Sequence, residues 1–286
     1  MGVSTPDTGE PMDAFICTTC GTQYAPAQQP PPACPICSDS RQYVPAGGQH
    51  WTTLAELQRG HHNHYRGLAP GLYAIATTPK TGIGQRALLL RTPGGNVLWD
   101  CISLLDDATI DIIRAFGGLA AVAISHPHYY TTMVEWAHAF DCPVWLHEDD
   151  REWVMRPDPL LRFWSGDAMV LPGVPGNMSL VRLGGHFEGG TVLHWPDGAE
   201  GRGALLSGDI LQVAADRRHV SFMWSYPNYL PLPASTVRQM EARLAPFGFD
   251  AVYGAFPDAE ITQDGKAAVA ASFRRYLSLL ERGTLE

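Results

Sequence analysis

Four side chains of types that commonly bind metal ions directly follow apolar, strand-like segments of the sequence. His126 and His128 come after LAAVAIS, His186 comes after MSLVRLGG, and Asp209 comes after GALLSG. Loops at strand ends are where a rigid sheet brings side chains from distant parts of a chain together. Imidazoles suit zinc or iron, and a carboxylate adds negative charge. One such residue is usually a surface or hydrogen-bonded group, but four at successive strand ends predict a metal site.

The residues beside these side chains would help to aim them. Pro127 stands between His126 and His128, and its fixed φ limits the local turn. Glycine pairs at 184–185 and 189–190 flank His186 and allow the backbone to approach closely.

The front of the chain carries two Cys-x-x-Cys pairs, Cys17 with Cys20 and Cys34 with Cys37. Each pair can form a tight turn that aims two thiolates at one ion, and two such turns close a tetrahedral four-sulfur site. The segment between the pairs, GTQYAPAQQPPPA, is poor in core-forming residues, so a metal ion would have to stabilise a module of this size. Two redox pairs or a disulfide knuckle are the alternatives. CTTCGTQY and CPICSDSRQYV resemble a zinc ribbon and also rubredoxin. We expect such a module at 1–48, with structural zinc favoured and iron as the alternative.

The composition favours strands and turns and argues against some partners. Of 286 residues, 45% are hydrophobic and only 17% charged, while 29 are Gly and 23 are Pro. The net charge of −9, without a Lys/Arg cluster, argues against nucleic acid and an anionic membrane as partners. No apolar run approaches the ~20 residues that cross a bilayer, and MGVSTPDTGEPMDAF lacks the features of a secretory signal. We therefore expect a cytoplasmic protein that acts on a small molecule. The sequence does not decide between a monomer and a homo-oligomer.

Apolar patterns predict alternating strands and helices after a linker at 49–70. Strands are expected at 72–78, 86–91, 96–100, 119–125, 143–147, 178–183, 190–195, 203–208 and 249–254, and helices at 106–116, 131–140, 234–245 and 265–282. This order predicts an α/β fold in which helices cover sheets.

Region 71–286 resembles the metallo-β-lactamase superfamily in the order and spacing of its motifs. SHPHYYT is similar to the HxHxDH motif of that superfamily, LGGHFEGGTVLHW to the loop that carries its third histidine, and LLSGDIL to its bridging-aspartate segment. TGIGQRALLLRTPGGNVLWD resembles its opening hairpins. The resemblance implies an αββα sandwich with the metal site at one edge. It also implies that His126, His128 and His186 are the first-metal ligands and that Asp209 stands at the bridging carboxylate.

The chain departs from this pattern at the ligands of the second metal. The Asp and His of HxHxDH fall at Tyr130 and Thr131, and the last histidine of the superfamily falls at Ala255. A phenol, a hydroxyl and a methyl group do not replace two imidazoles and a carboxylate as zinc ligands. We therefore predict one ion, zinc or iron, in the main site, with Asp209 as its fourth ligand or as a nearby base.

The first functional hypothesis is a mononuclear metal-dependent hydrolase of an ester, thioester or lactone. Asp209 would orient water or accept its proton, and Tyr130 would donate a hydrogen bond to the developing oxyanion. Persulfide dioxygenases share the superfamily fold and use a single iron, so an iron-dependent oxidoreductase is an alternative. A non-catalytic metal-binding protein is the other alternative, because three ligands of the superfamily are missing.

Overall fold

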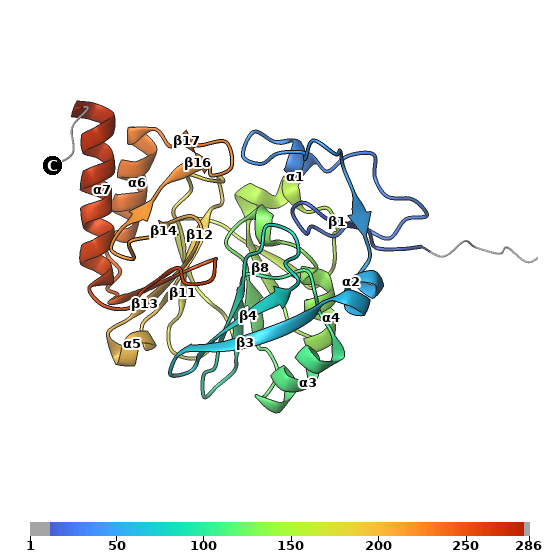
Figure 1. Cartoon of the computed structure of the whole chain (residues 1–286). Coiled ribbons are helices and arrows are strands. Elements are labelled where there is room, and N and C mark those ends of the chain that lie inside the picture. The colour runs from blue at the N-terminus through green and yellow to red at the C-terminus, as the bar shows by residue number, and fades with distance from the viewer. Residues whose placement is uncertain (1–11, 283–286) are drawn as a thin grey trace, which may run out of the picture.

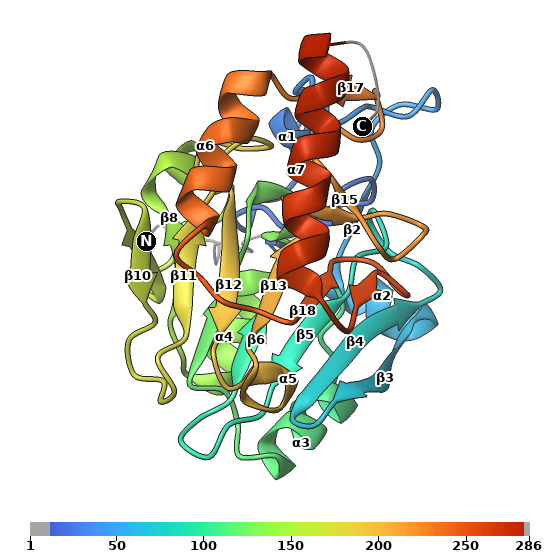
Figure 2. The ribbon, with the colours of Figure 1, turned by 90° about the vertical axis from the view of Figure 1, so that its left-hand side faces the viewer.

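Two β-sheets pack face to face, and helices cover the outer side of each sheet (Figure 1). The structure is a computed structural model, and it describes residues 12–282. Helices α3 and α4 lie outside one sheet, and α6 and α7 lie outside the other, as the turned view in Figure 2 also shows. This is the αββα sandwich that the resemblance to the metallo-β-lactamase superfamily implies.

The first sheet has seven strands in the order β3-β4-β5-β6-β7-β8-β9. Neighbours are antiparallel from β3 to β6 and parallel from β6 to β9. Parallel neighbours need a crossover, and α3 (Asp107–Ala115) and α4 (Met133–Phe140) provide the crossovers on either side of β7. The strands are β3 (His62–Ala69), β4 (Leu72–Thr78), β5 (Ala87–Leu90), β6 (Val97–Trp99), β7 (Ala121–Ala123), β8 (Val144–His147) and β9 (Leu161–Trp164).

The second sheet has six strands in the order β10-β11-β12-β13-β18-β19. Its only parallel pair is β13 with β18, and α6 (Ala234–Leu244) lies in the connection between them. The last helix, α7 (Gly265–Arg282), packs beside α6. The strands are β10 (Ala168–Val170), β11 (Ser179–Arg182), β12 (Thr191–Trp195), β13 (Ala204–Gly208), β18 (Ala251–Gly254) and β19 (Glu260–Ile261).

The long connection from β13 to β18 carries short elements. Strands β14 (Gln212–Val213) and β15 (Val220–Ser221) form one hairpin, and β16 (Met223–Ser225) and β17 (Leu230–Pro231) form another. A four-residue helix, α5 (Gly198–Gly201), joins β12 to β13. Two 3₁₀ turns, Pro127–Tyr129 and Glu148–Trp153, follow β7 and β8. Within residues 12–282, no helix combines the length and apolarity needed to cross a membrane.

Burial of the strands on both faces explains why many of them are continuous apolar runs in the sequence. Trp99, Leu193 and Leu206 are fully buried between the two sheets, and separate clusters lie under α3 and α4 and under α6 and α7. Strands covered on both faces have no solvent-facing positions, so they carry apolar residues without alternation.

The segment 49–70, which we expected to be a linker, is instead mostly regular structure. Strand β2 (Trp51–Thr52) pairs with β1 (Ile16–Cys17), helix α2 (Leu54–Gly60) follows, and β3 pairs with β4 along its length. Thr53 and Glu56 form a capping box that starts α2. Strand β3 is at the edge of its sheet and half exposed, so its HHNH sequence has the polar character of a loop.

The cysteine-rich module lies at the end of the sandwich that also carries the β16–β17 hairpin (Figure 1). It contains β1 and one short helix, α1 (Pro35–Ser38), whose N-cap residue is Cys34.

Candidate metal centre

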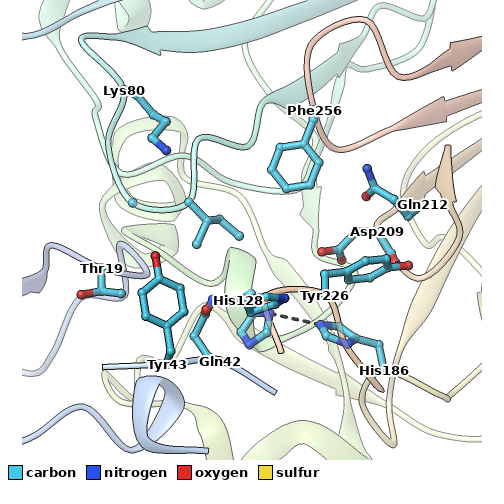
Figure 3. Close-up of a pocket in the computed structure, with 13 residues that line it drawn as sticks. Thr19, Gln42, Tyr43, Lys80, His128, His186, Asp209, Gln212, Tyr226 and Phe256 are labelled. Atoms are coloured by element: carbon cyan, nitrogen blue, oxygen red, sulfur yellow. Dashed lines mark hydrogen bonds between the residues drawn. The ribbon is translucent and has the colours of Figure 1, made fainter. Parts of the chain in front are cut away.

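Three buried imidazoles converge at one end of the two sheets. His126 and His128 lie in and beside the 3₁₀ turn after β7, and His186 lies in the β11–β12 loop. Each is at most 2% exposed, and each offers one ring nitrogen within 4.8 Å of those of the other two. His186 Nε2 is 3.2 Å from His128 Nδ1 (Figure 3). The structure therefore brings together the three histidines that the sequence selects.

Hydrogen bonds on the far side of two rings fix which nitrogen faces the centre. His126 Nδ1 is 2.9 Å from Ser125 Oγ, and the Ser125 backbone N–H donates to Asp100 Oδ1 at 2.8 Å. His186 Nδ1 donates to the backbone carbonyl of Trp224 at 2.7 Å. In both residues Nε2 is thereby left to point inwards. Such outer contacts orient metal-binding histidines and raise their basicity.

The donor set fits a single metal ion. Nitrogen ligands about 2.0–2.1 Å from a tetrahedral zinc ion are roughly 3.3–3.4 Å apart, close to the 3.2 Å between His128 and His186. His126 Nε2 is buried without a hydrogen-bond partner, an arrangement that a ligand would satisfy. Burial lowers the pKa of all three imidazoles, which keeps them in the neutral form that binds metal.

Asp209 lies beside this set, directly after β13. Its Oδ1 has no hydrogen-bond partner and is 3.3 Å from His126 Nε2, but the carboxylate is outside the group whose donor atoms all lie within 4.8 Å of one another. Burial raises the pKa of Asp209, and the nearby His186 and the Tyr129 hydroxyl oppose that shift. The preceding Gly208 has φ +56, and a Cβ there would lie 2.7 Å from Ser125 Oγ. A glycine is therefore required at this approach of β13 to β7.

The three positions where the superfamily has second-metal ligands are filled by packed side chains. Tyr130, Thr131 and Ala255 are 1–3% exposed. The Tyr130 hydroxyl donates to the Asp150 carbonyl at 3.4 Å, so it is directed away from the three imidazoles. Tyr129 is the tyrosine against the site, with its ring centroid 4.4 Å from that of His126. Among residues 12–282, the three-histidine set and the four-cysteine set are the two groups of His, Cys, Asp or Glu that could hold an ion.

A pocket of about 280 Å³ opens onto this centre (Figure 3). His128, His186 and Asp209 form part of its lining, so an ion held there would be in contact with a bound small molecule. Tyr226 and Pro227, from the aromatic stretch at 222–233, also line the pocket. The pocket further includes Lys80, Gln42 and Tyr43, which no local motif in the sequence indicated.

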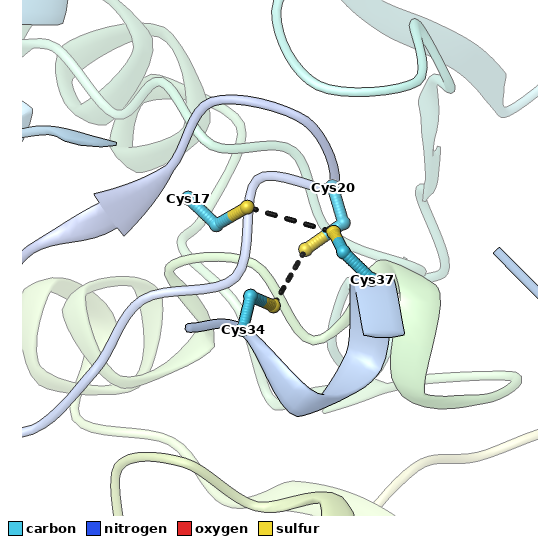
Figure 4. Close-up of side chains that lie close together, drawn as sticks. All are labelled: Cys17, Cys20, Cys34 and Cys37. Carbon is cyan, nitrogen blue, oxygen red and sulfur yellow. Dashed lines mark hydrogen bonds between the residues drawn. The ribbon is translucent and has the colours of Figure 1, made fainter. Parts of the chain in front are cut away.

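The four cysteines form a second, closed cluster (Figure 4). Cys17 Sγ is 3.6 Å from Cys37 Sγ, and Cys20 Sγ is 3.7 Å from Cys34 Sγ. Zinc–sulfur bonds of about 2.3 Å place tetrahedral sulfurs about 3.8 Å apart, whereas a disulfide needs about 2.05 Å. The hydrogen bond with Cys20 lowers the pKa of Cys17 and favours a thiolate there. The geometry fits a zinc ribbon, in which four sulfurs fill the coordination shell.

The ribbon packs against the main metal centre. Arg41 is 6% exposed, and its guanidinium carbon lies 4.2 Å from the ring centroid of Phe187 and 4.4 Å from that of Trp224. Ser225 Oγ donates to the Arg41 carbonyl at 3.1 Å, and the Trp224 indole donates to Ser40 Oγ at 3.1 Å. Trp224 is also the residue whose carbonyl orients His186. No spacing in the sequence indicates this contact, because its partners are far apart along the chain.

Comparison with solved structures confirms the fold. The metallo-β-lactamase DIM-1 superposes with a TM-score of 0.55 and 15% identity, over 78% of this chain and 98% of its own. The mono-zinc form of FIM-1 from Pseudomonas aeruginosa gives 0.53 and 12%, over 77% of this chain and 96% of its own. The resemblance seen in the sequence motifs is thus confirmed at the level of the fold.

Comparison with curated sequences identifies a close relative. No profile of a known protein family matches the chain. YmaE of Bacillus subtilis (strain 168), described as uncharacterized, is 49% identical over 271 residues, which cover 94% of this chain and 97% of YmaE. The chain therefore belongs to the same protein family as YmaE and has the metallo-β-lactamase fold.

Proposed function

We propose that the protein is a mononuclear metal-dependent hydrolase that acts on an ester, thioester or lactone. The observation that carries this proposal is the convergence of three buried, neutral imidazoles at a pocket, with the unpartnered Oδ1 of Asp209 beside them. Three protein ligands leave one position of a tetrahedral ion open, which is the arrangement of catalytic rather than structural sites.

His126, His128 and His186 would hold the ion, and Asp209 would act on water. A bound ion lowers the pKa of its water and polarises a carbonyl oxygen. Asp209 Oδ1 is free of other hydrogen bonds, so it can orient the water and accept its proton. The Ser125 and Trp224 contacts keep two of the imidazoles fixed while this happens. The acyl carbon gains the hydroxyl, and the alcohol or thiol leaves with a proton.

The ribbon ion has a different proposed role. Four buried thiols leave no open coordination position, so we propose a structural zinc ion there. The ribbon is then a folding unit whose stability depends on its metal.

The test is a panel of aryl esters, thioesters and lactones, run on protein loaded with zinc and, separately, with ferrous iron. His126→Ala should lose both the main-site ion and hydrolysis. Asp209→Asn should keep most of the ion and lose turnover, because an amide can orient water but cannot accept its proton. The exposed Asp107→Asn is a matched control and should behave as wild type.

Two outcomes would reject the proposal. Oxygen consumption with iron and a persulfide, without hydrolysis of any ester, would show that the protein is an iron-dependent oxidoreductase. A silent panel with the main site fully loaded would instead support a non-catalytic metal-binding protein.

A further inference from the structure

The pocket has one positively charged wall, and that wall is built around Lys80. Lys80, in the β4–β5 loop, is the one lysine or arginine in the pocket lining, and Asp209 is the one acidic residue. Within residues 12–282, no carboxylate pairs with Lys80. Figure 3 shows Lys80 and Tyr43 on the opposite side of the pocket from His186 and Asp209.

The two lysines of the chain have different surroundings. The chain contains two lysines, Lys80 and Lys266, although its net charge is −9. Lys266 donates to three backbone carbonyls after α6, at 2.7–3.1 Å, and so has a structural role. Lys80, by contrast, is exposed and lines the pocket.

The loop that carries Lys80 accommodates its side chain closely. Gly84 has φ +84, and a Cβ there would lie 2.5 Å from Lys80 Cδ. The alkyl part of Lys80 thus packs over the glycine, and a larger residue at position 84 would displace it.

The ribbon supplies the neighbouring part of the wall. Gln42 is 5% exposed and lines the pocket. The backbone of Gln42 is anchored, because Asn228 donates to its carbonyl at 3.0 Å. The amide N–H₂ of such a side chain is a donor from which a carboxylate can accept a hydrogen bond. Tyr43, which is 49% exposed, adds an aromatic face at the mouth.

We propose that Lys80 and the ribbon residues Gln42 and Tyr43 form the recognition subsite for a carboxylate carried by the acyl part of a small substrate. Lys80 pairs with the carboxylate, and the Gln42 amide N–H₂ donates a hydrogen bond to it. This inference rests on the proposed hydrolase for the scissile bond, but the subsite itself can bind a carboxylate without catalysis. It also gives the ribbon a second role, as one wall of the substrate pocket.

The catalytic test compares two aryl esters that differ in charge alone. One is the hemiester of adipate, and the other is its neutral adipamate counterpart, in which a carboxamide replaces the distal carboxylate. Wild type should prefer the anionic ester in kcat/KM by roughly ten- to hundredfold, the usual effect of one charge-assisted hydrogen bond. Lys80→Gln should abolish the preference. Arg59→Gln, an exposed change of the same charge on α2, should keep it.

A binding measurement separates failure of the subsite from failure of the hydrolase. Calorimetry with adipate itself should show binding to wild type and to Arg59→Gln, at least tenfold weaker binding to Lys80→Gln, and weaker binding to Gln42→Leu. If neither ester is hydrolysed but adipate binds in this pattern, the hydrolase proposal fails for these esters and the subsite stands. Equal use of both esters by wild type, or adipate binding that Lys80→Gln leaves unchanged, would overturn the subsite.

Discussion

Arg41 should control how tightly the main site holds its metal, although it is a ribbon residue and not a ligand. The test is Arg41→Met, which keeps much of the side-chain length and removes the charge. Arg41 lies over Phe187 and Trp224 and forms ion pairs with Asp39 at 2.9 Å and Glu188 at 3.4 Å. The Trp224 carbonyl is the acceptor that orients His186. Loosening this contact should therefore disturb the orientation of His186 and weaken metal binding at the main site.

The size of the effect follows from these contacts. Each desolvated cation–π contact contributes about 1–2 kcal/mol. The Glu188 pair adds little because that carboxylate is 55% exposed. We expect Arg41→Met to lower the free energy of unfolding by about 2–3 kcal/mol. Loss of an outer contact to a ligand typically weakens metal affinity 10–100-fold, and we expect a change in that range at the main site.

Chelator competition measures the metal affinity, and thermal unfolding measures the stability. Arg151→Met is the matched control, because Arg151 also lies over an aromatic ring, Phe163 at 3.6 Å, but is 54% exposed and remote from the ligands. An Arg41→Met protein whose main-site affinity equals that of Arg151→Met would refute the coupling between ribbon and metal centre. A fall in stability without a fall in affinity would refute it equally.

Three further predictions concern other parts of the site. Cys34→Ser should release the ribbon ion, seen as one fewer zinc per chain, and should make residues before β2 sensitive to protease; a resistant, metal-free ribbon would contradict the structural role. Tyr130→Phe should leave kcat within about twofold of wild type, because its hydroxyl contacts only the Asp150 carbonyl at 3.4 Å; a hundredfold loss would show that the phenol reaches the substrate. Burial raises the pKa of Asp150 to about 7, so the native state binds its proton more tightly than the unfolded chain. Stability should then fall as pH rises from about 4 to 7, by up to roughly 4 kcal/mol from this group. Asp150→Asn should remove that fall, which thermal unfolding of both proteins at about pH 5 and about pH 8 would measure. An equal loss of stability between these two pH values in wild type and Asp150→Asn would contradict the reasoning.

The parts of the fold that the sequence predicts are those with a local signal. The strand that ends before His126 and the strand that ends before Asp209 are apolar runs because both their faces are buried. Helices α3 and α7 have apolar residues at helical spacing and lie within a residue of the expected bounds. The histidines and cysteines could be selected because their residue types and spacing by themselves indicate metal binding.

The remaining features depend on tertiary contacts that no local pattern carries. Strand β3 has a polar sequence because it is an edge strand, so it could not be told from a linker. Tyr129 and Tyr130 are neighbours in one tight turn, and the sequence does not show which ring faces His126. Arg41 packs on Phe187, and Lys80 lines the pocket, from segments far from the ligands in sequence, so only the packed structure brings them there.

The most direct test of the account is to count and locate the metal ions in protein purified without added metal. Elemental analysis should give about two ions per chain, and anomalous diffraction should place one at the four cysteines and one at the three histidines. His186→Ala should lose only the second, and Cys34→Ser should lose the first. Two peaks about 3.5–4 Å apart at the histidines, the usual separation in two-metal sites, would contradict the mononuclear site, as would a histidine set that takes up no ion when zinc or ferrous iron is supplied.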